Sequence, residues 1–577
     1  MSELRRSELC RHFALRVSAA ASALAVVAGC AAIPTSGDPQ IVKAEGAPAQ
    51  SDAEVRVIAQ GPRPGDSPIS IVSGFLEASG TTEEGFATAR KFLTPASSTR
   101  WNARGITIYD QARFSLGERS GDRVVLSTVA VGRVDDQGVY TAEPGERSVQ
   151  FTFQLVRTGG DWRIDEPPTG LLVSRQDFER EYLKVDNYFV ARPPRTSVLV
   201  PDPVYLPRAS TSPTARLEAL LRGPSRWLDA VAMTAVPTGA ALAEPVNVLS
   251  GVALVRLTPE SLPIEGVQRD LMLAQIVMTL MQDPEVSQVE VRALAEPPLS
   301  FGGAGNTVLR RADVVPYLPA DQRPPPAPAY FVRDGSAYIS GEQMVQGPIA
   351  TDAELVEIAV SPGGGLLAGV SSDRTTLVTG RADDPKRLVS RAKGTNLRSL
   401  SFDGDGNLWV LSGEGGGTVV LRYPPSGPPQ RVRVDGFEPR QILRLRVAAD
   451  GVRLALVLDT VRGTQVYVAQ STEDTDGLEI SGPRRMAGQL TGLRSVDWMD
   501  SGRLVVLGSL PDGQLQPFEV QLGGPVRALA GTLPGITEVS AAYGQPLMAA
   551  TKKQIYRLRE DGAWLPEGPG TAVTYPG

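Results

Sequence analysis

Hydrophobic and polar positions alternate in short runs over the second half of the chain, and turns rich in Gly, Asp and Ser separate the runs. Five segments share one plan, in which an apolar strand leads through such a turn into a second apolar strand. Their equivalent positions recur at roughly 40–50 residues, the period of propeller blades; these positions are Val360, Phe402, Val447, Trp498 and Ala541. We therefore predict a C-terminal all-β propeller over residues 330–577. Six blades are expected, with the strand-like segment 329–340 helping to close the ring.

The region from residue 68 to residue 185 mixes two periodicities. Apolar residues recur at helical spacing from Pro68, and a second helix is expected to stop at Pro95. Strand-like runs follow, and the pair Gly159-Gly160 predicts a hairpin between the last two. Helices followed by antiparallel strands predict an α+β domain. The order of these elements is similar, at the level of the fold, to NTF2-like domains.

A second α+β unit is predicted over residues 186–316. Ser212 and Pro213 have the residue types of a helix cap and a first helical position, and Ser250-Gly251 predicts the turn of a hairpin. A long helix is expected over residues 265–282, with its methionines facing the core and with Val267 on the same core-facing stripe as Met278 and Met281. The Pro-rich segment 317–329 predicts a semi-rigid linker to the propeller.

The N-terminus carries the pattern of a secretion signal. Arginines precede an apolar run, Val17 to Ala28, which is too short for a bilayer span but suits a signal-peptide core. The sequence Val27-Ala28-Gly29-Cys30 resembles a bacterial lipobox, in which Cys30 takes a diacylglycerol thioether and, after cleavage, an N-acyl chain. Residues 1–29 are then a lipoprotein signal peptide, and residues 30–67 a flexible tether. The alternative is an ordinary secretory signal in which the cysteine is accidental.

Composition removes several kinds of chemistry from the mature chain. The single histidine, His12, and one of the two cysteines, Cys10, lie in the leader. Zinc sites built from Cys and His, and nucleophiles that depend on a histidine, are therefore not expected. We predict a non-enzymatic protein with no catalytic residues, no cofactor and no metal. The net charge of −6 gives no reason to expect nucleic acid as a partner.

The segment Ser390–Lys393 matches S-x-x-K, a nucleophile motif of penicillin-binding enzymes. The pattern is short, its companion K-T-G is absent, and Lys393-Gly394-Thr395 presents the same residues in another order. The segment is also expected to fall between propeller strands. We interpret the match as coincidence.

A calcium loop is the other candidate site. Positions 1, 3, 5 and 12 of such a loop are matched by Asp403, Asp405, Asn407 and Glu414. Position 6, which is normally Gly, is Leu408, and the strand-like residues after it would carry Glu414 away from the other three. A blade hairpin that uses Asp-Gly turn chemistry explains the same residues.

The order of these pieces resembles the actinobacterial LpqB lipoprotein family, which combines a GerMN domain with a propeller. The residues that carry the resemblance are "GCAAIPTSG", "DWRIDEPPTGLLVSRQDFEREY", "ALLRGPSRWL", "LAQIVMTL" and the propeller from about Tyr330. The resemblance implies a lipid-anchored protein on the extracytoplasmic face of the cell membrane. It also implies contact with the outer part of the sensor histidine kinase MtrB of the MtrA–MtrB two-component system, with effects on cell division and envelope homeostasis. Of functional residues it carries over Cys30 alone.

One alternative function of another class remains open. A propeller pocket could bind or process a cell-wall polymer, and paired carboxylates for such chemistry cannot be judged from sequence. A deep cleft lined with aromatic and carboxylate side chains would favour this alternative. A flat apolar patch with a polar rim would favour the signalling partner.

Overall fold

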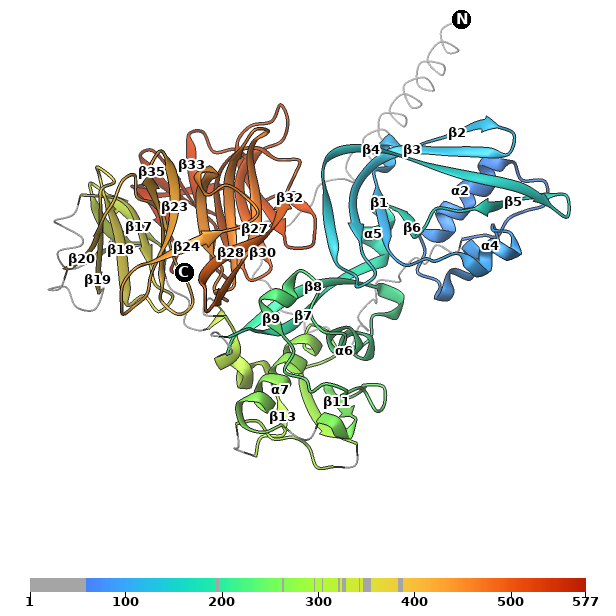
Figure 1. The fold of residues 1–577 in the computed structure, drawn as a ribbon, viewed down its shortest axis with the longest axis horizontal. Helices are drawn as coiled ribbons and strands as arrows, with labels where there is room; N and C mark the ends of the chain where they lie inside the picture. The colour runs from blue at the N-terminus through green and yellow to red at the C-terminus, as the bar shows by residue number, and fades with distance from the viewer. Residues whose placement is uncertain are drawn as a thin grey trace, which may run out of the picture. The chain divides into compact units, whose positions relative to one another are not determined.

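The structure is a computed structural model that describes residues 59–577 except 194–196, 262–263, 295, 303–304, 320–321, 324–327, 342, 346–353 and 382–387. All the described residues belong to one compact unit, in which two α+β domains precede a β-propeller (Figure 1). The predicted signal peptide, Cys30 and most of the predicted tether lie outside the described residues. Within the described part, no helix is both long enough and apolar enough to cross a membrane.

The first domain packs helices against one mixed sheet. Its helices are α2 (Pro68–Ser79), α3 (Ala87–Arg90), α4 (Pro95–Arg100) and α5 (Arg175–Glu181). Its sheet has the order β5-β4-β3-β1-β6, with β2 paired to β3, and the strands are β1 (Ile106–Tyr109), β2 (Ser115–Ser120), β3 (Arg123–Val134), β4 (Tyr140–Thr158), β5 (Asp161–Glu166) and β6 (Leu171–Ser174). Phe75 of α2 meets Phe153 of β4 edge to face, with 6.1 Å between ring centroids. The predicted α+β architecture is confirmed.

The end of the predicted tether differs from the expectation of a flexible chain. Ala59 is 8% exposed and belongs to the hydrophobic core of the first domain. The backbone N–H of Gly65 donates to the Asp161 carboxylate over 3.2 Å. Residues 59–67 therefore pack onto the domain ahead of α2, because an apolar contact and a backbone hydrogen bond hold them there. The polar and Pro-rich composition of the segment does not predict either contact.

The second domain has the GerMN-like α+β class that was predicted. A three-stranded sheet, β8-β7-β9, lies beside a four-stranded sheet, β10-β11-β12-β13. The strands are β7 (Tyr182–Ala191), β8 (Leu199–Pro207), β9 (Ala232–Met233), β10 (Asn247–Leu249), β11 (Val252–Leu257), β12 (Gln288–Ala293) and β13 (Val308–Leu309), and the helices are α6 (Pro213–Leu221) and α7 (Gly266–Leu280). Strand β7 begins at Tyr182, four residues ahead of the expected start of this unit at residue 186.

Two local predictions in this domain agree with the structure, and one detail does not. Ser250 and Gly251 both have positive φ, 51° and 81°, as a tight hairpin turn between β10 and β11 requires. Strands β11 and β12 are parallel, and α7 is the crossover between them. Met272 and Met278 of α7 are buried in the core as expected. Val267 is 59% exposed, because it lies in the first turn of α7 and projects beyond the packed part of the helix.

The C-terminal region is a propeller of six four-stranded blades, counted over the described strands. Two of the blades join at their outer edge, where β24 and β28 pair in parallel. The first blade that is continuous in the chain consists of β17 (Leu355–Val360), β18 (Leu366–Ser371), β19 (Thr376–Arg381) and β20 (Leu388–Lys393). The second consists of β21 (Arg398–Phe402), β22 (Leu408–Glu414), β23 (Gly417–Tyr423) and β24 (Gln430–Val434). The third consists of β25 (Ile442–Val447), β26 (Arg453–Thr460), β27 (Gly463–Asp474) and β28 (Gly477–Met486).

The remaining blades include the one that closes the ring. Two are continuous in the chain: β29 (Thr491–Asp500), β30 (Arg503–Ser509), β31 (Gln516–Gln521) and β32 (Val526–Ala528); then β33 (Ile536–Ser540), β34 (Met548–Thr551), β35 (Gln554–Leu558) and β36 (Trp564–Pro569). The closing blade joins β14 (Tyr330–Arg333), β15 (Ser336–Ile339) and β16 (Gln343–Met344) to β37 (Thr571–Thr574). Antiparallel pairing of Tyr330 with Thr574 closes it. The predicted all-β propeller is confirmed, with segment 329–340 in the closing blade.

Candidate functional site at the propeller axis

The innermost strands of the blades carry a regular pattern of polar side chains. Each innermost strand can be numbered from the equivalent position of the repeat, such as Val360 in β17. The residue two positions before it is apolar and buried in every copy, and these residues are Ile358, Leu400, Leu445, Val496 and Val539. Strand alternation places the residues three and one position before on the opposite face of the strand, toward the next blade of the ring. These are Glu357, Ser399, Arg444, Ser495 and Glu538 in one layer and Ala359, Ser401, Arg446, Asp497 and Ser540 in the next.

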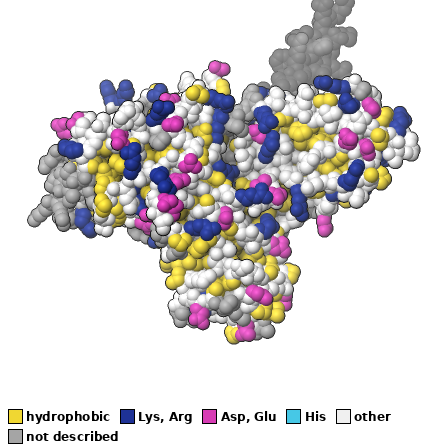
Figure 2. Space-filling view, in the orientation of Figure 1, with side chains coloured by type: hydrophobic (Ala, Val, Ile, Leu, Met, Phe, Trp, Pro, Cys, Tyr) yellow, Lys and Arg dark blue, Asp and Glu magenta, His cyan; other side chains and the backbone are white. Residues whose placement is uncertain are grey.

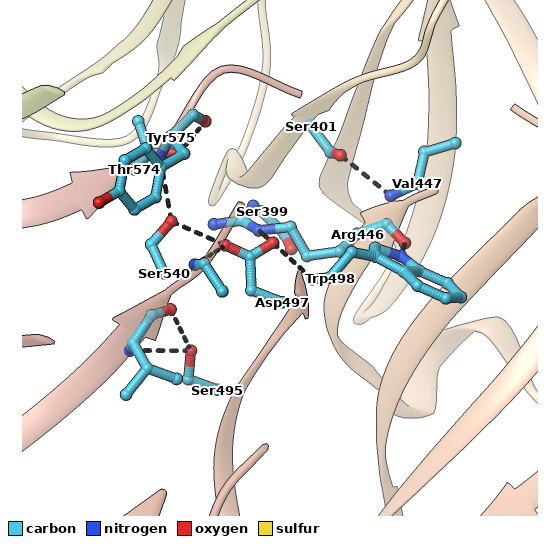
Figure 3. A network of polar contacts seen from close by, with 12 residues as sticks. Ser399, Ser401, Arg446, Val447, Ser495, Asp497, Trp498, Ser540, Thr574 and Tyr575 are labelled. Atoms are coloured by element: carbon cyan, nitrogen blue, oxygen red, sulfur yellow. Dashed lines mark hydrogen bonds and ion pairs between the residues drawn. The ribbon is translucent and has the colours of Figure 1, made fainter. Parts of the chain in front are cut away.

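The serines of these layers bind the backbone of the next innermost strand. Ser399 Oγ accepts from the N–H of Leu445 over 2.7 Å and donates to the carbonyl of the same residue over 3.0 Å. Ser401 Oγ accepts from the N–H of Val447 over 3.0 Å. Ser495 contacts the N–H and carbonyl of Val539 in the same way (Figure 3). Each serine thus joins two neighbouring blades through backbone groups.

Asp497 and Ser540 continue this pattern toward the closing blade (Figure 3). Asp497 Oδ2 accepts from Ser540 Oγ over 2.7 Å and from the N–H of Ala541 over 3.1 Å. Ser540 Oγ in turn accepts from the N–H of Tyr575 over 3.0 Å. At the other side of the closing blade, Glu357 Oε1 accepts from the N–H of Leu400 over 3.1 Å. We call these contacts the inter-blade bonds, and they tie the ring together around its axis.

Strand β25 departs from the pattern, because it has arginines at both positions, where the other four strands have Glu, Ser, Asp or Ala. A guanidinium donates hydrogen bonds and accepts none. Arg446 Nε lies 3.6 Å from Asp497 Oδ1, and its guanidinium donates to the carbonyl of Leu400. The indole N–H of Trp498 then donates to the Arg446 carbonyl over 3.1 Å. The contacts between β25 and β29 therefore combine an ion pair with one neutral hydrogen bond.

Burial dominates the electrostatics of the axial carboxylates. It raises the pKa of Asp497, while Arg446 and the hydrogen bonds from Ser540 and Ala541 oppose the rise. Burial likewise raises the pKa of Glu538, and the nearby Glu357 adds to the rise. These carboxylates act as hydrogen-bond acceptors within the inter-blade bonds. Within the described part of the chain, no group of three or more His, Cys, Asp or Glu side chains could hold a metal ion.

The residues of the predicted calcium-loop match separate into two structural roles. The Asp403 carboxylate accepts from the backbone N–H groups of Asp405 and Asn407, from the Asn407 amide and, over 3.0 Å, from Trp409 Nε1. Glu414 lies at the far end of β22 and pairs with Arg431 over 2.6 Å. The blade-hairpin interpretation therefore accounts for all four residues.

The S-x-x-K match lies elsewhere than expected. Residues 390–393 belong to β20, the outermost strand of its blade, and not to a connection between strands. The strand propensity of the flanking residues prevails over the turn signals nearby. Lys393 Nζ donates to Thr376 Oγ1 of the neighbouring strand over 2.6 Å. This contact is a cross-strand hydrogen bond of an ordinary kind.

Sequence reasoning missed a fully buried ion pair beside the second domain. Arg453 Nε and Nη2 donate to Asp450 Oδ2 over 2.8 and 2.6 Å, and the two side chains are 1% and 0% exposed. Arg453 also donates to the carbonyls of Pro201 and Ser501. A small pocket, partly open to solvent, is lined by Arg453 and Trp227 beside this pair. An Asp-x-x-Arg spacing at a turn was the available signal, but it does not reveal burial.

The surface offers no single strong electrostatic feature on the face drawn in Figure 2. Basic and acidic side chains are interspersed there over both the α+β domains and the propeller. Fold and site together define a class: a multidomain protein in which two α+β domains precede a six-bladed propeller tied by inter-blade bonds. Comparison with known proteins then gives the family. The chain belongs to the LpqB lipoprotein family.

Three family models match successive parts of the chain. The LpqB N-terminal domain matches residues 61–179, the sporulation and spore germination model matches residues 186–293, and the LpqB beta-propeller domain matches residues 337–576. Lipoprotein LpqB of Streptomyces coelicolor is 30% identical, with 97% of each chain covered. Lipoprotein LpqB of Streptomyces avermitilis is 31% identical, with 98% of this chain and 99% of that one covered.

Among solved structures, the tandem GerMN domains of GerM from Bacillus subtilis match 23% of this chain and 46% of that one. The identity is 18% and the TM-score is 0.19. The relatives' names identify a lipoprotein family and not an enzyme family, which agrees with a membrane-anchored lipoprotein.

Proposed function

We propose that this protein is an extracytoplasmic lipoprotein, anchored through Cys30, that binds the outer domain of the sensor histidine kinase MtrB. Binding modulates the MtrA–MtrB two-component system and through it cell division and envelope homeostasis. The anchor consists of a diacylglycerol thioether and an N-terminal acyl chain such as palmitate, added after removal of the signal peptide 1–29. The protein catalyses no reaction in this role.

The observation that carries the proposal is similarity to Lipoprotein LpqB over nearly the whole chain. The similarity includes both α+β domains and the propeller, so the proposed role does not rest on one common fold. The lipobox at Cys30 supplies the anchor chemistry. Two acyl chains are needed for stable attachment, because a single chain gives marginal binding.

Anchoring explains how a modest affinity would suffice. A lipid-held protein is confined to the layer beside the membrane, which raises its effective concentration at the outer domain of a membrane kinase. Binding changes signalling only if the protein prefers one state of the kinase, since equal affinity for both states shifts no population. The proposal therefore requires a difference in affinity between two kinase states.

The test combines binding with signalling. The purified chain is titrated against the isolated MtrB outer domain, with the outer domain of an unrelated sensor kinase as control, and micromolar affinity for MtrB alone is expected. Deletion of the gene should change the phosphorylated fraction of MtrA on phosphate-affinity gels, and wild-type complementation should restore it. A Cys30→Ser copy should restore it poorly, because it binds but is not held at the membrane.

Absence of binding at high micromolar concentration, together with unchanged MtrA phosphorylation after deletion, would contradict the proposal. Cell-wall polymer binding would then be examined by sedimentation of the protein with purified cell-wall material. Binding to MtrB with no change in phosphorylation would also contradict the modulator role.

A further inference from the structure

Strand β25 places a positive charge, that of Arg444, at a position where the other strands of the repeat form inter-blade bonds. Arg444 stands in the layer where the other innermost strands place Glu or Ser. Its guanidinium donates to the carbonyl of Leu443 over 3.0 Å. No carboxylate of the described residues lies within the 4 Å of an ion pair with Arg444, so Glu538 of the same layer acts on it only at longer range.

A second arginine on the neighbouring innermost strand has the same property. Arg398, at the start of β21, donates to the carbonyls of Asn396 and Ile442 over 3.2 and 3.1 Å. It also donates to Thr418 Oγ1 over 2.7 Å. All three acceptors are neutral, and among the residues the structure describes no carboxylate pairs with Arg398. The contacts fix the side chain in place without compensating its charge.

A third arginine reaches the same region from the β18–β19 turn. Arg374 Nη1 donates to Glu357 Oε2 over 3.0 Å and to the Leu397 carbonyl over 3.1 Å. The other oxygen of Glu357 is occupied by the N–H of Leu400. Two carboxylates, those of Glu357 and Glu538, thus face three guanidinium groups, those of Arg374, Arg398 and Arg444, which we call the arginine cluster.

The three cations act on one another. Burial lowers the pKa of Arg398, and the positive charges of Arg444 and Arg374 lower it further, against the opposing effect of Glu357. Like charges held close together cost folding free energy, and solvent screens the exposed Arg444 more than it screens the half-buried Arg398. An inter-blade bond has also been given up at Arg444. An anion bound among the guanidinium groups would offset the repulsion and engage their unused N–H donors.

We propose that the arginine cluster, which lies where β21 and β25 adjoin the β18–β19 turn, is an oxyanion-binding site that takes a carboxylate or phosphate group of a ligand. The planar guanidinium suits both groups, because its parallel N–H donors match two oxygens of one oxyanion. The convergence of Arg374, Arg398 and Arg444 from three different elements gives the site more than one such donor pair. The site does not depend on the proposed contact with MtrB, and either proposal can fail alone.

The experiment is calorimetric titration of the purified full chain at low ionic strength with two probes, pyrophosphate and tetraglutamate. Wild-type protein is expected to bind at least one probe, with affinity that falls as salt is added. Arg444→Gln should weaken binding by about tenfold or more, which corresponds to loss of one charged hydrogen-bonding group. Arg462→Gln is the matched control, because Arg462 is an exposed arginine in the β26–β27 turn outside the cluster.

Thermal unfolding separates loss of binding from loss of folding. Without an anion, Arg444→Gln should be at least as stable as wild type, since a repulsive charge is removed. With the probe present, the wild-type midpoint should rise more than that of the variant. Binding of pyrophosphate alone identifies a phosphate-bearing ligand, and binding of tetraglutamate alone identifies an acidic protein segment. The proposal is overturned if neither probe binds at millimolar concentration, or if Arg444→Gln binds as tightly as wild type.

Discussion

Replacing Asp450 with Ala removes the carboxylate that holds a fully buried guanidinium. Arg453 loses hydrogen bonds of 2.8 and 2.6 Å, and the N–H groups of Val452 and Arg453 lose their contacts with Asp450 Oδ1 over 3.0 and 3.2 Å. The cation stays buried, with the carbonyls of Pro201 and Ser501 as its remaining acceptors. Breaking such a pair costs about 3–5 kcal/mol. At roughly 2–4 °C per kcal/mol for a domain of this size, the midpoint should fall by about 6–20 °C.

The assay is thermal and urea unfolding of the full chain, followed by circular dichroism. Glu414→Ala is the matched control, because Glu414 pairs with Arg431 at the same N–O distance of 2.6 Å as the closest Arg453–Asp450 contact. The control pair is 54% and 65% exposed, and such pairs contribute about 0–1 kcal/mol. The comparison therefore isolates burial. If Asp450→Ala destabilises the protein no more than Glu414→Ala does, the reasoning from burial is refuted.

Two other outcomes are expected. Cys30→Ser should appear in the soluble fraction or as an uncleaved precursor on immunoblots, and a normally processed, membrane-bound variant would contradict the lipobox interpretation. Burial raises the folded-state pKa of Glu538, so the native state binds its proton more tightly than the unfolded chain does. The free energy of unfolding should then decline as pH rises above about 4.3, the unfolded value, toward the raised pKa. Glu538→Gln should lack that decline in urea titrations across this window, and a constant difference between the two proteins would contradict it.

The propeller could be predicted because its signal is repeated. Val360, Phe402 and Val447 end the innermost strands β17, β21 and β25, and Trp498 lies near the end of β29. Each blade must place an apolar strand, a turn and a second apolar strand in the same order, so the register is written several times along the chain. The hairpin turn at Ser250 and Gly251 could also be predicted, because its positive φ angles restrict the residue types that fit there.

The inter-blade bonds could not be predicted, because they join residues whose proximity depends on ring closure. Ser399 lies 46 residues from its partner Leu445, and the serine alone carries no sign of that distant N–H. The aligned repeat does contain a signal in retrospect, since polar residues recur at two fixed positions inside apolar strands. The burial of Arg453 had no such repeated signal. Its environment comes from the second domain as well as from the propeller.

The pairing of β37 with β14 also determines when the propeller ring can close during synthesis of the chain. The innermost strand of the closing blade is the last strand made, while its three partners are among the first of the propeller. Because the ribosome makes the chain from its N-terminus, the ring stays open until Thr571–Thr574 has been synthesised. Pairing between strands so far apart in the sequence is also slow. During that interval β14 presents an unpaired edge to other chains and to proteases. Ring closure thus distinguishes the complete chain from truncated products, because a chain that ends before Thr571 retains the unpaired edge of β14.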